Sequence, residues 1–255
     1  MKRITETKEA AQQPVADEKE GSAGGQIALP FAYRPRFGRS DFVAAPSNAA
    51  ARGWVLDAEA MWRWPEGRMA LWGECGTGKT HLLSVWAARH GAPVIEGRRL
   101  NEQDVADLFQ EGGFRAVALD NADKVRNEAD LLHLINLVRE QRMALLMAGQ
   151  AAPARWPVSL PDLASRLRAT ASVPIGQAEE ALLRRLFLRL LAERQMVVAQ
   201  PVTEWLLRRL PRNAGAIRDM AARLDAAALA SGEKVTRALA ASVLESLLAE
   251  EAGQA

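Results

Sequence analysis

Residues 73–80 read Gly-Glu-Cys-Gly-Thr-Gly-Lys-Thr and fit the phosphate-binding pattern G-x-x-x-x-G-K-[ST]. The glycines allow the backbone to wrap around a phosphate, with amide groups pointing inward at the start of a helix. In this pattern the lysine neutralises the β- and γ-phosphates of a nucleotide, and the threonine hydroxyl holds Mg²⁺. The stretch predicts a site for ADP or ATP with Mg²⁺. We assign to it Gly73, Gly76, Gly78, Lys79, Thr80 and the adjoining His81, for which a structural role is the alternative.

Short apolar runs and helical patterns alternate on both sides of this loop. We expect strands over residues 68–73, 93–96, 114–120, 144–149 and 172–175, and helices over 47–65, 79–89, 100–110, 127–142 and 160–168. Such alternation implies a parallel sheet with helices on both faces. From residue 177 onward only helical patterns follow. The predicted fold class is therefore α/β, with a nucleotide-binding core over residues 42–176 and a small all-helical domain over residues 177–250.

The composition excludes several classes of protein. The chain has 255 residues, a net charge of +2, and no apolar run of the roughly 18 residues that span a membrane. Its single cysteine, Cys75, excludes an intrachain disulfide framework and a cysteine-based zinc site. Residues 1–25 are polar and lack the apolar stretch of a signal peptide, so we expect them to form a disordered tail. These features predict a cytoplasmic protein without membrane contacts.

An acidic residue ends the expected strand over residues 114–120. Asp120 stands where a nucleotide-binding sheet places its carboxylate on the Mg²⁺ side, so we assign Thr80 and Asp120 to the metal. Enzymes of this kind that hydrolyse nucleotides usually carry a second acid next, but the chain has Asn121, whose amide cannot act as a general base. Asp123 is a substitute at an unusual spacing, and a capping or bridging role is the simpler interpretation. We therefore expect weak or no hydrolysis by the isolated chain.

Several stretches together resemble the DnaA family of AAA+ proteins. They are Phe42-Val43 with Pro46-Ser47-Asn48, the run GECGTGKTHLL over residues 73–83, the LDN of residues 119–121, and LPDLASRL over residues 160–167. The last stretch is most similar to the short homologues of DnaA called Hda, or HdaA. The resemblance covers residues 42–250 and implies an AAA+ P-loop core with a helical lid that binds ADP or ATP.

The same resemblance implies roles for three arginines. Arg166 falls where AAA+ proteins carry an arginine that reaches the γ-phosphate of a neighbouring subunit, although by its pattern alone it is one surface arginine among many. The lid arginine of the family falls near residues 212–218, where Gly215 occupies one plausible position. We keep both Arg212 and Arg218 as candidates for binding the nucleotide.

The run Gln-Ile-Ala-Leu-Pro-Phe, residues 26–31, resembles the peptide by which Hda proteins dock on the sliding clamp of DNA polymerase III. Its chemistry suits such a peptide, because Gln26 offers an amide, Leu29 and Phe31 are apolar anchors, and the proline lowers the entropy of ordering. The alternative is that Leu29 and Phe31 attach the N-terminus to the core.

The resemblance implies a negative regulator of DNA replication initiation. The expected partners are DnaA, the sliding clamp, and DNA reached indirectly through the clamp at the nucleoid, while homo-oligomerisation stays open. Arg166 would promote hydrolysis of the ATP held by DnaA, so the chemistry would occur in the partner's site. The rival interpretations are an autonomous ATPase, such as a helicase loader or a DnaA-like remodeller acting on DNA, a pure binding adaptor, and, with less support, a P-loop kinase.

Replacing both apolar anchors of the peptide tests the clamp assignment. Leu29→Ala and Phe31→Ala should each weaken clamp binding by on the order of 2 kcal/mol, because a short peptide concentrates its energy in a few anchors. Clamp affinity is measured by surface plasmon resonance, and ADP binding by the same protein is the control. Normal clamp binding by the double variant, or its unfolding, would leave the alternative of N-terminal attachment.

Overall fold

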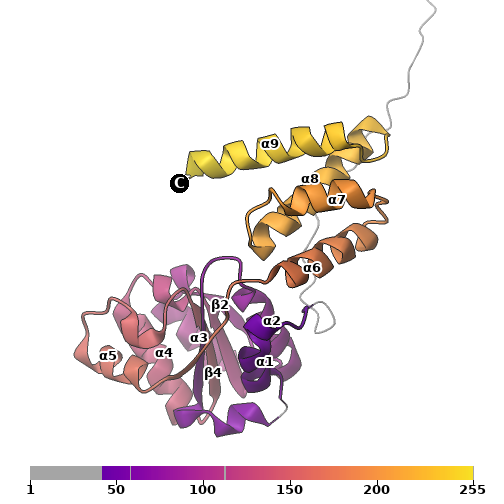
Figure 1. The fold of residues 1–255 in the computed structure, drawn as a ribbon. Coiled ribbons are helices and arrows are strands. Elements are labelled where there is room, and N and C mark those ends of the chain that lie inside the picture. Colours follow the sequence, from indigo (N-terminus) through magenta and orange to yellow (C-terminus); the bar gives the residue numbers. More distant parts are fainter. Residues whose placement is uncertain (1–41, 58, 112, 255) are drawn as a thin grey trace, which may run out of the picture. The chain divides into compact units, whose positions relative to one another are not determined.

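The computed structural model describes residues 42–57, 59–111 and 113–254, which form a sheet with covering helices followed by a helical lid (Figure 1). The predicted tail and the clamp peptide, with Gln26, Leu29 and Phe31, lie outside the described residues. Within the described ranges no helix combines the length and the apolar character needed to span a bilayer.

Five parallel strands form the sheet, in the order β2-β3-β4-β1-β5. They are β1 (Arg68–Trp72), β2 (Val94–Glu96), β3 (Ala116–Asp120), β4 (Ala144–Gly149) and β5 (Ala171–Pro174). This arrangement confirms the predicted α/β class. Because all strands are parallel, their carboxyl ends meet at one edge of the sheet and their amino ends at the opposite edge. We call these the carboxyl edge and the amino edge.

Side chains that alternate along the strands divide the core into two layers. The helices of the first layer are α1 (Ala49–Leu56) and α2 (Lys79–His90), and those of the second are α3 (Glu102–Glu111), α4 (Glu128–Glu140) and α5 (Pro161–Arg168). Met69 and Leu71 of β1 pack in the first layer, whereas Ala70 between them packs in the second. Burial on both faces explains why β1, β3 and β4 are continuous apolar runs in the sequence.

The lid has its own apolar core. Its helices are α6 (Glu180–Glu193), α7 (Gln200–Leu207), α8 (Ala214–Ser231) and α9 (Arg237–Gln254). Phe187 of α6 is fully buried in this core, with Leu206 of α7, Leu224 of α8 and Leu244 of α9 in the same cluster. The lid therefore has a packed interior separate from the two layers of the sheet.

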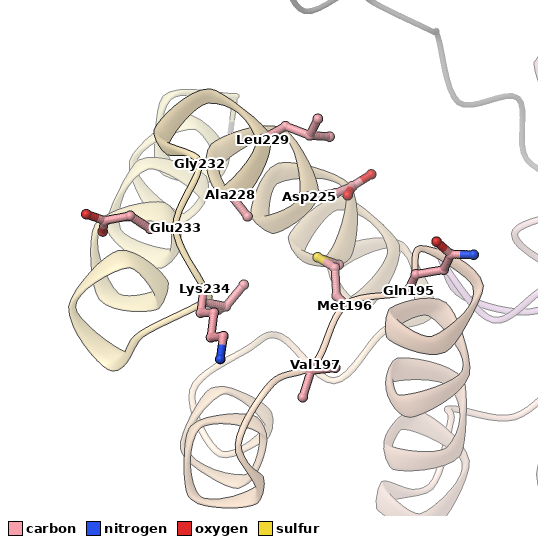
Figure 2. Close-up of a pocket in the computed structure, with 10 residues that line it drawn as sticks. Gln195, Met196, Val197, Asp225, Ala228, Leu229, Gly232, Glu233 and Lys234 are labelled. Carbon is pink, nitrogen blue, oxygen red and sulfur yellow. The ribbon is translucent and has the colours of Figure 1, made fainter.

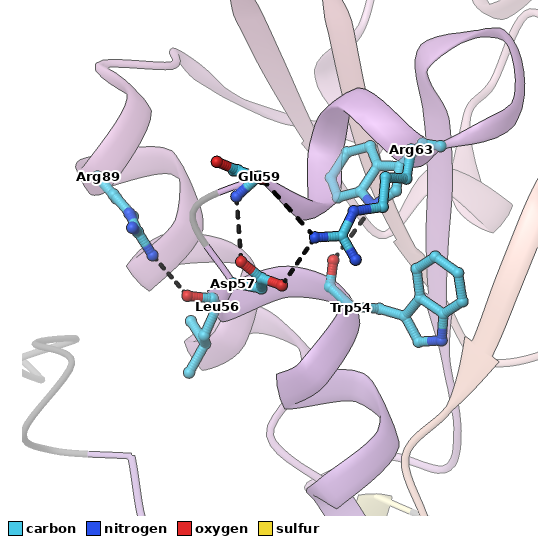
Figure 3. Close-up of polar contacts among 7 residues, drawn as sticks. Trp54, Leu56, Asp57, Glu59, Arg63 and Arg89 are labelled. Carbon is cyan, nitrogen blue, oxygen red and sulfur yellow. Dashed lines mark hydrogen bonds and ion pairs between the residues drawn. The ribbon is translucent and has the colours of Figure 1, made fainter.

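The predicted helix over residues 47–65 is wrong, because α1 ends at Leu56 and two 3₁₀ turns follow it. The carboxylate of Asp57 accepts a hydrogen bond from the Glu59 backbone amide (3.1 Å), which stabilises a turn at this point. Arg63 pairs with the other oxygen of Asp57 (3.4 Å), and Arg89 of α2 donates to the Leu56 carbonyl (Figure 3). These polar contacts stop the helix although its apolar spacing continues.

Ser47 lies in the 3₁₀ turn before α1 and is bonded to the segment that leads into the lid. Its backbone amide and its hydroxyl both donate to the Glu179 carboxylate, at 2.7 and 2.8 Å, and its carbonyl accepts from the Gly176 amide (2.9 Å). Hydrogen bonds from the Glu179 backbone amide and from Ser47 hold the pKa of that carboxyl below its usual value. Ser47 therefore joins the segment before α1 to the junction that leads into the lid.

Phe187→Ala tests the packing of the lid. Removing a fully buried ring leaves a cavity and should lower the free energy of unfolding by about 3–5 kcal/mol. The neighbouring Leu188 is 48% exposed, so Leu188→Ala is the matched control and should change stability by less than about 0.5 kcal/mol. Urea denaturation followed by circular dichroism gives both values, and equal effects at the two positions would contradict this packing.

Candidate nucleotide site

The loop over residues 73–78 joins β1 to α2 at the carboxyl edge. Gly76 and Gly78 have φ angles of 77° and 100°, in the left-handed region that favours glycine. A Cβ atom on Gly73 would lie 2.3 Å from the Ile175 carbonyl oxygen, so a side chain is excluded there by contact with the backbone. The three glycines are therefore required by the path of the chain, which forms an open cradle ahead of a helix N-terminus.

Lys79 and Thr80 begin α2 and point their polar atoms at the loop and at β3. The Lys79 ammonium donates to the carbonyl oxygens of Gly73 and Glu74, both at 2.7 Å. The Thr80 hydroxyl donates to the Asp120 carboxylate (2.8 Å), which also accepts from the backbone amide of Asn121 (3.0 Å). The structure thus brings together the lysine, hydroxyl and carboxylate that the sequence assigned to phosphate and Mg²⁺.

Burial disfavours the charged forms of both ionisable groups. Loss of hydration lowers the pKa of Lys79 and raises the pKa of Asp120. A nucleotide with Mg²⁺ would relieve both penalties, because its phosphates would face Lys79 and the cation would face Asp120. The residues present therefore fit this ligand. Lys79 would hold phosphate oxygens, and Thr80 and Asp120 would hold the metal.

The lid completes the site on one side. A cavity of about 310 Å³ is lined by Glu74, Cys75, Gly76 and Thr77 of the loop and by Gln177, Ala178, Arg212 and Asn213 at the lid. The Ala214 amide donates to the Gly76 carbonyl (3.3 Å), and a Cβ atom on Gly76 would lie 2.9 Å from the Cβ atom of Asn213. Loop and lid are therefore in direct contact.

The remaining nucleotide candidates are not equivalent in position. Arg212 borders the cavity, whereas Arg218 is half-buried on α8, makes other contacts and does not line it. His81 is buried, and its ring meets Phe42 edge-on with 5.2 Å between centroids. Phe42 also lies near Gly78, where a Cβ atom would approach its ring to 3.4 Å. Of the two lid candidates, Arg212 is the one that borders the cavity, and the ring of His81 packs against Phe42.

Sequence reasoning missed a pair of side chains beside Asp120. The Asn121 amide donates to both carboxylate oxygens of Glu96, each at 3.2 Å, and Glu96 of β2 is in register with Asp120 of β3. The signal was Glu96 itself, an acid at the end of a short strand. Asp123 takes the bridging role, because its carboxylate accepts from the Gln150 backbone amide (2.9 Å).

Arg166 lies at the amino edge, across the sheet from the phosphate loop. Its carbonyl accepts from the Thr170 hydroxyl (2.9 Å), and that hydroxyl also contacts the guanidinium of Arg68, the first residue of β1 (3.4 Å). Strands of this length separate the two edges by roughly 15 Å. The structure therefore does not bring Arg166 together with Lys79, Thr80 and Asp120.

A larger cavity, of about 600 Å³, lies within the lid rather than at the phosphate loop. It is bordered by the connection after α6, the last turns of α8 and the loop before α9 (Figure 2). Val197 and Leu229 expose apolar side chains there, and Asp225, Glu233 and Lys234 carry the charges. None of the predicted site residues that the structure describes lines this cavity, so volume alone does not identify the functional site.

Comparison with known proteins supports the fold through structure rather than sequence. No family model and no curated protein sequence matches the chain. Domain III of the Thermotoga maritima replication initiation protein DnaA has a TM-score of 0.69 at 17% identity, over 84% of this chain and 98% of that one. AMPPCP-bound DnaA from Aquifex aeolicus has a TM-score of 0.54 at 20% identity, over 70% of this chain and 61% of that one.

The Thermotoga maritima Holliday junction branch migration motor RuvB has a TM-score of 0.62 at 15% identity, over 82% of this chain and 72% of that one. At such identities the likeness concerns the fold alone. The chain therefore has the fold of DnaA domain III and RuvB, and its class is the α/β class that the sequence predicted.

Lys79→Ala tests the nucleotide site. A ligand at 100 times its Kd stabilises the native state by about 2.7 kcal/mol, which raises Tm by several degrees in a chain of this size. ADP or ATP with Mg²⁺ should produce this rise in the parent protein and none in the variant, because the cation that faces the phosphates is gone. Differential scanning fluorimetry measures it, with Lys234→Ala in the lid as the control. If the nucleotide raises the Tm of the Lys79→Ala variant as much as that of the parent protein, the nucleotide binds at another site.

Proposed function

We propose that this chain is an Hda-type negative regulator of replication initiation. It binds ADP or ATP with Mg²⁺ in its own site and promotes hydrolysis of the ATP that DnaA holds. The observation that carries the proposal is the position of Arg166, at the opposite edge of the sheet from the chain's own phosphate loop. Within the described residues its guanidinium has no hydrogen bond or ion pair, so it is available to a neighbour's γ-phosphate and cannot act on its own nucleotide.

The nucleotide part of the proposal is supported by the loop geometry. The Lys79 ammonium is held by two carbonyls that phosphate oxygens would replace, and Thr80 and Asp120 are already in hydrogen-bond contact. The solved DnaA of Aquifex aeolicus, which has a similar fold, carries AMPPCP. Contact between Gly76 and the lid gives the bound nucleotide a structural role, because phosphates in the loop would order the lid beside it.

Weak hydrolysis in the chain's own site follows from Asn121. The position next to Asp120 carries an amide, which neither accepts a proton from water nor holds a negative charge. This amide is engaged with Glu96. The resident nucleotide therefore serves mainly to organise the protein, and ADP suffices for that role.

The last part of the proposal, binding to the sliding clamp and through it to DNA, rests on the sequence alone. Gln26, Leu29 and Phe31 would tether the protein to the sliding clamp, and through the clamp to DNA, where DnaA is regulated. The protein would then work in the cytoplasm at the nucleoid. Attachment to the clamp would raise the effective concentration of Arg166 near DNA-bound DnaA, although the clamp would make no contact with Arg166 itself.

A second candidate function is an autonomous ATPase that acts on DNA. The observation that favours it is Glu96, whose carboxylate lies 3.2 Å from the Asn121 amide and beside Asp120, where it could take the part of the missing acid. The fold is also that of RuvB, a branch migration motor. ATP turnover at an ordinary enzyme rate by the isolated chain would favour this candidate over the regulator.

Arg166→Ala tests the trans-acting finger. An arginine in this role contributes roughly 10³-fold or more to phosphoryl transfer, so stimulation of DnaA-ATP hydrolysis should fall by about that factor. The fold, the clamp contact and the chain's own nucleotide should be kept. Arg166→Lys should recover little, because an ammonium cannot reproduce the planar guanidinium. The measurement is single-turnover hydrolysis of ATP preloaded on DnaA, with clamp loaded on DNA.

Arg168→Ala is the matched control, because Arg168 is exposed two residues further along the same helix. It should stay largely active. Full stimulation by Arg166→Ala would remove the finger and leave a binding adaptor. Equal losses in both variants would indicate a general charge effect rather than a finger.

A further inference from the structure

Unpaired arginines gather at the amino edge of the sheet. Some arginines of the lid pair with acids, namely Arg184, Arg189, Arg194 and Arg223, whereas Arg208 and Arg212 have no ion pair to the described residues. The unpaired set at the amino edge consists of Arg115, Arg139, Arg142, Arg166 and Arg168, of which Arg166 is half-buried and the others are exposed. None of the five guanidinium groups has an ion pair or a hydrogen bond to the described residues. We call these five residues the arginine edge.

Topology brings the five together from distant parts of the sequence. Arg115 directly precedes β3, and its carbonyl accepts from the amide of Ala144, the first residue of β4 (3.0 Å). Arg139 and Arg142 lie at the end of α4, just before β4, and Arg166 and Arg168 at the end of α5, before β5. Glu66 lies close enough to two members of the set to be affected by their charges. The pKa of its carboxyl is lowered first by a hydrogen bond from Arg68 and then by the charges of Arg139 and Arg166. Glu66 itself is already paired with Arg68 (2.8 Å).

The architecture does not require these side chains. A cation near a helix C-terminus gains about 0.3–1 kcal/mol from the helix dipole, which makes arginine favourable after α4 and α5 but does not call for four. Arg142 is also in the left-handed region, with a φ angle of 53°, where glycine or asparagine is the usual residue after a helix. Arg142 is exposed at this position, and its guanidinium has no ion pair to the described residues.

The ligand that matches the arginine edge is a row of phosphates. Guanidinium binds phosphate in a planar, bidentate geometry. The strands β3, β4, β1 and β5 are neighbours, so their amino ends span roughly 14 Å. Duplex DNA carries about one charge per 1.7 Å of its axis with both strands counted, so about eight phosphates lie along this length and roughly half of them face one side of the duplex. The whole chain has a net charge of only +2, so the attraction is local to this edge.

We propose that the arginine edge binds the phosphate backbone of duplex DNA directly and without sequence preference. The contact is independent of the clamp peptide and of the nucleotide site, which lies at the opposite edge. It does not rest on the proposed regulatory function, because DNA binding is measured without DnaA and without the clamp.

The test uses the full chain with ADP and Mg²⁺, and a labelled duplex of about 20 base pairs followed by fluorescence anisotropy at several salt concentrations. The variant combines Arg115→Ala, Arg139→Ala and Arg142→Gly, which leaves the proposed finger Arg166 unchanged. The matched control combines Arg98→Ala, Arg99→Ala and Arg208→Ala, three exposed arginines outside the amino edge. Arg142→Gly suits the left-handed backbone, so Tm of the first variant should not fall through this position.

For the parent chain, log K should fall linearly with log salt concentration, with a slope of about −3 to −4.5, since each phosphate contact contributes about 0.9. The arginine-edge variant should lose about 2.7 of this slope and on the order of 100-fold in affinity near 0.1 M salt. The control should bind as the parent does. Absence of salt-dependent binding by the parent, an unchanged arginine-edge variant, or an equal loss in the control would each overturn the proposal.

Discussion

Because all five strands of the sheet are parallel, its two edges differ in chemistry. At the carboxyl edge the chain leaves each strand into a loop, and the loop after β1 and the acid at the end of β3 meet there. The C-terminal ends of the helices lie at the amino edge, where the helix dipole favours cations. The buried Lys79 and Asp120 lie at the carboxyl edge, and the unpaired arginines lie at the amino edge.

Under the proposed function, this polarity separates the residues that would hold a nucleotide from the arginine that would act on one. The carboxyl edge supplies the phosphate cradle but offers Asn121 where an acid would activate water, with Glu96 held beside it. The opposite edge supplies Arg166, a group suited to transition-state charge that is about one strand length from the cradle. Under the proposed function, a partner would supply the nucleotide on which Arg166 acts, because Arg166 and the cradle of the same copy lie at opposite edges of the sheet.

Sequence patterns predicted the parts of the molecule that are local or continuous in the chain. The phosphate loop was recognisable from the sequence because every loop of this kind needs glycine at the same positions of its backbone. The strands β1, β3 and β4 were recognisable because burial on both faces makes them uniformly apolar. The prediction of one helix over residues 47–65 was wrong because Asp57 and Arg63 take part in a turn. The polar contacts of this turn cannot be recognised from the spacing of apolar residues. The Glu96–Asn121 pair and the arginine edge depend on the order of the strands in the sheet, and this order cannot be predicted from the spacing of residues in the sequence.

The bonds around Ser47 have a mechanical consequence. The segment that leads to α1 is attached at Ser47 to Glu179, at Ala44 to Arg185 of α6, and at Phe42 to the ring of His81 behind the phosphate loop. Tension applied at Phe42 reaches these contacts before it reaches any strand of the sheet. A pull at that point would therefore load the lid junction and the phosphate loop first, and the sheet would be shielded from it.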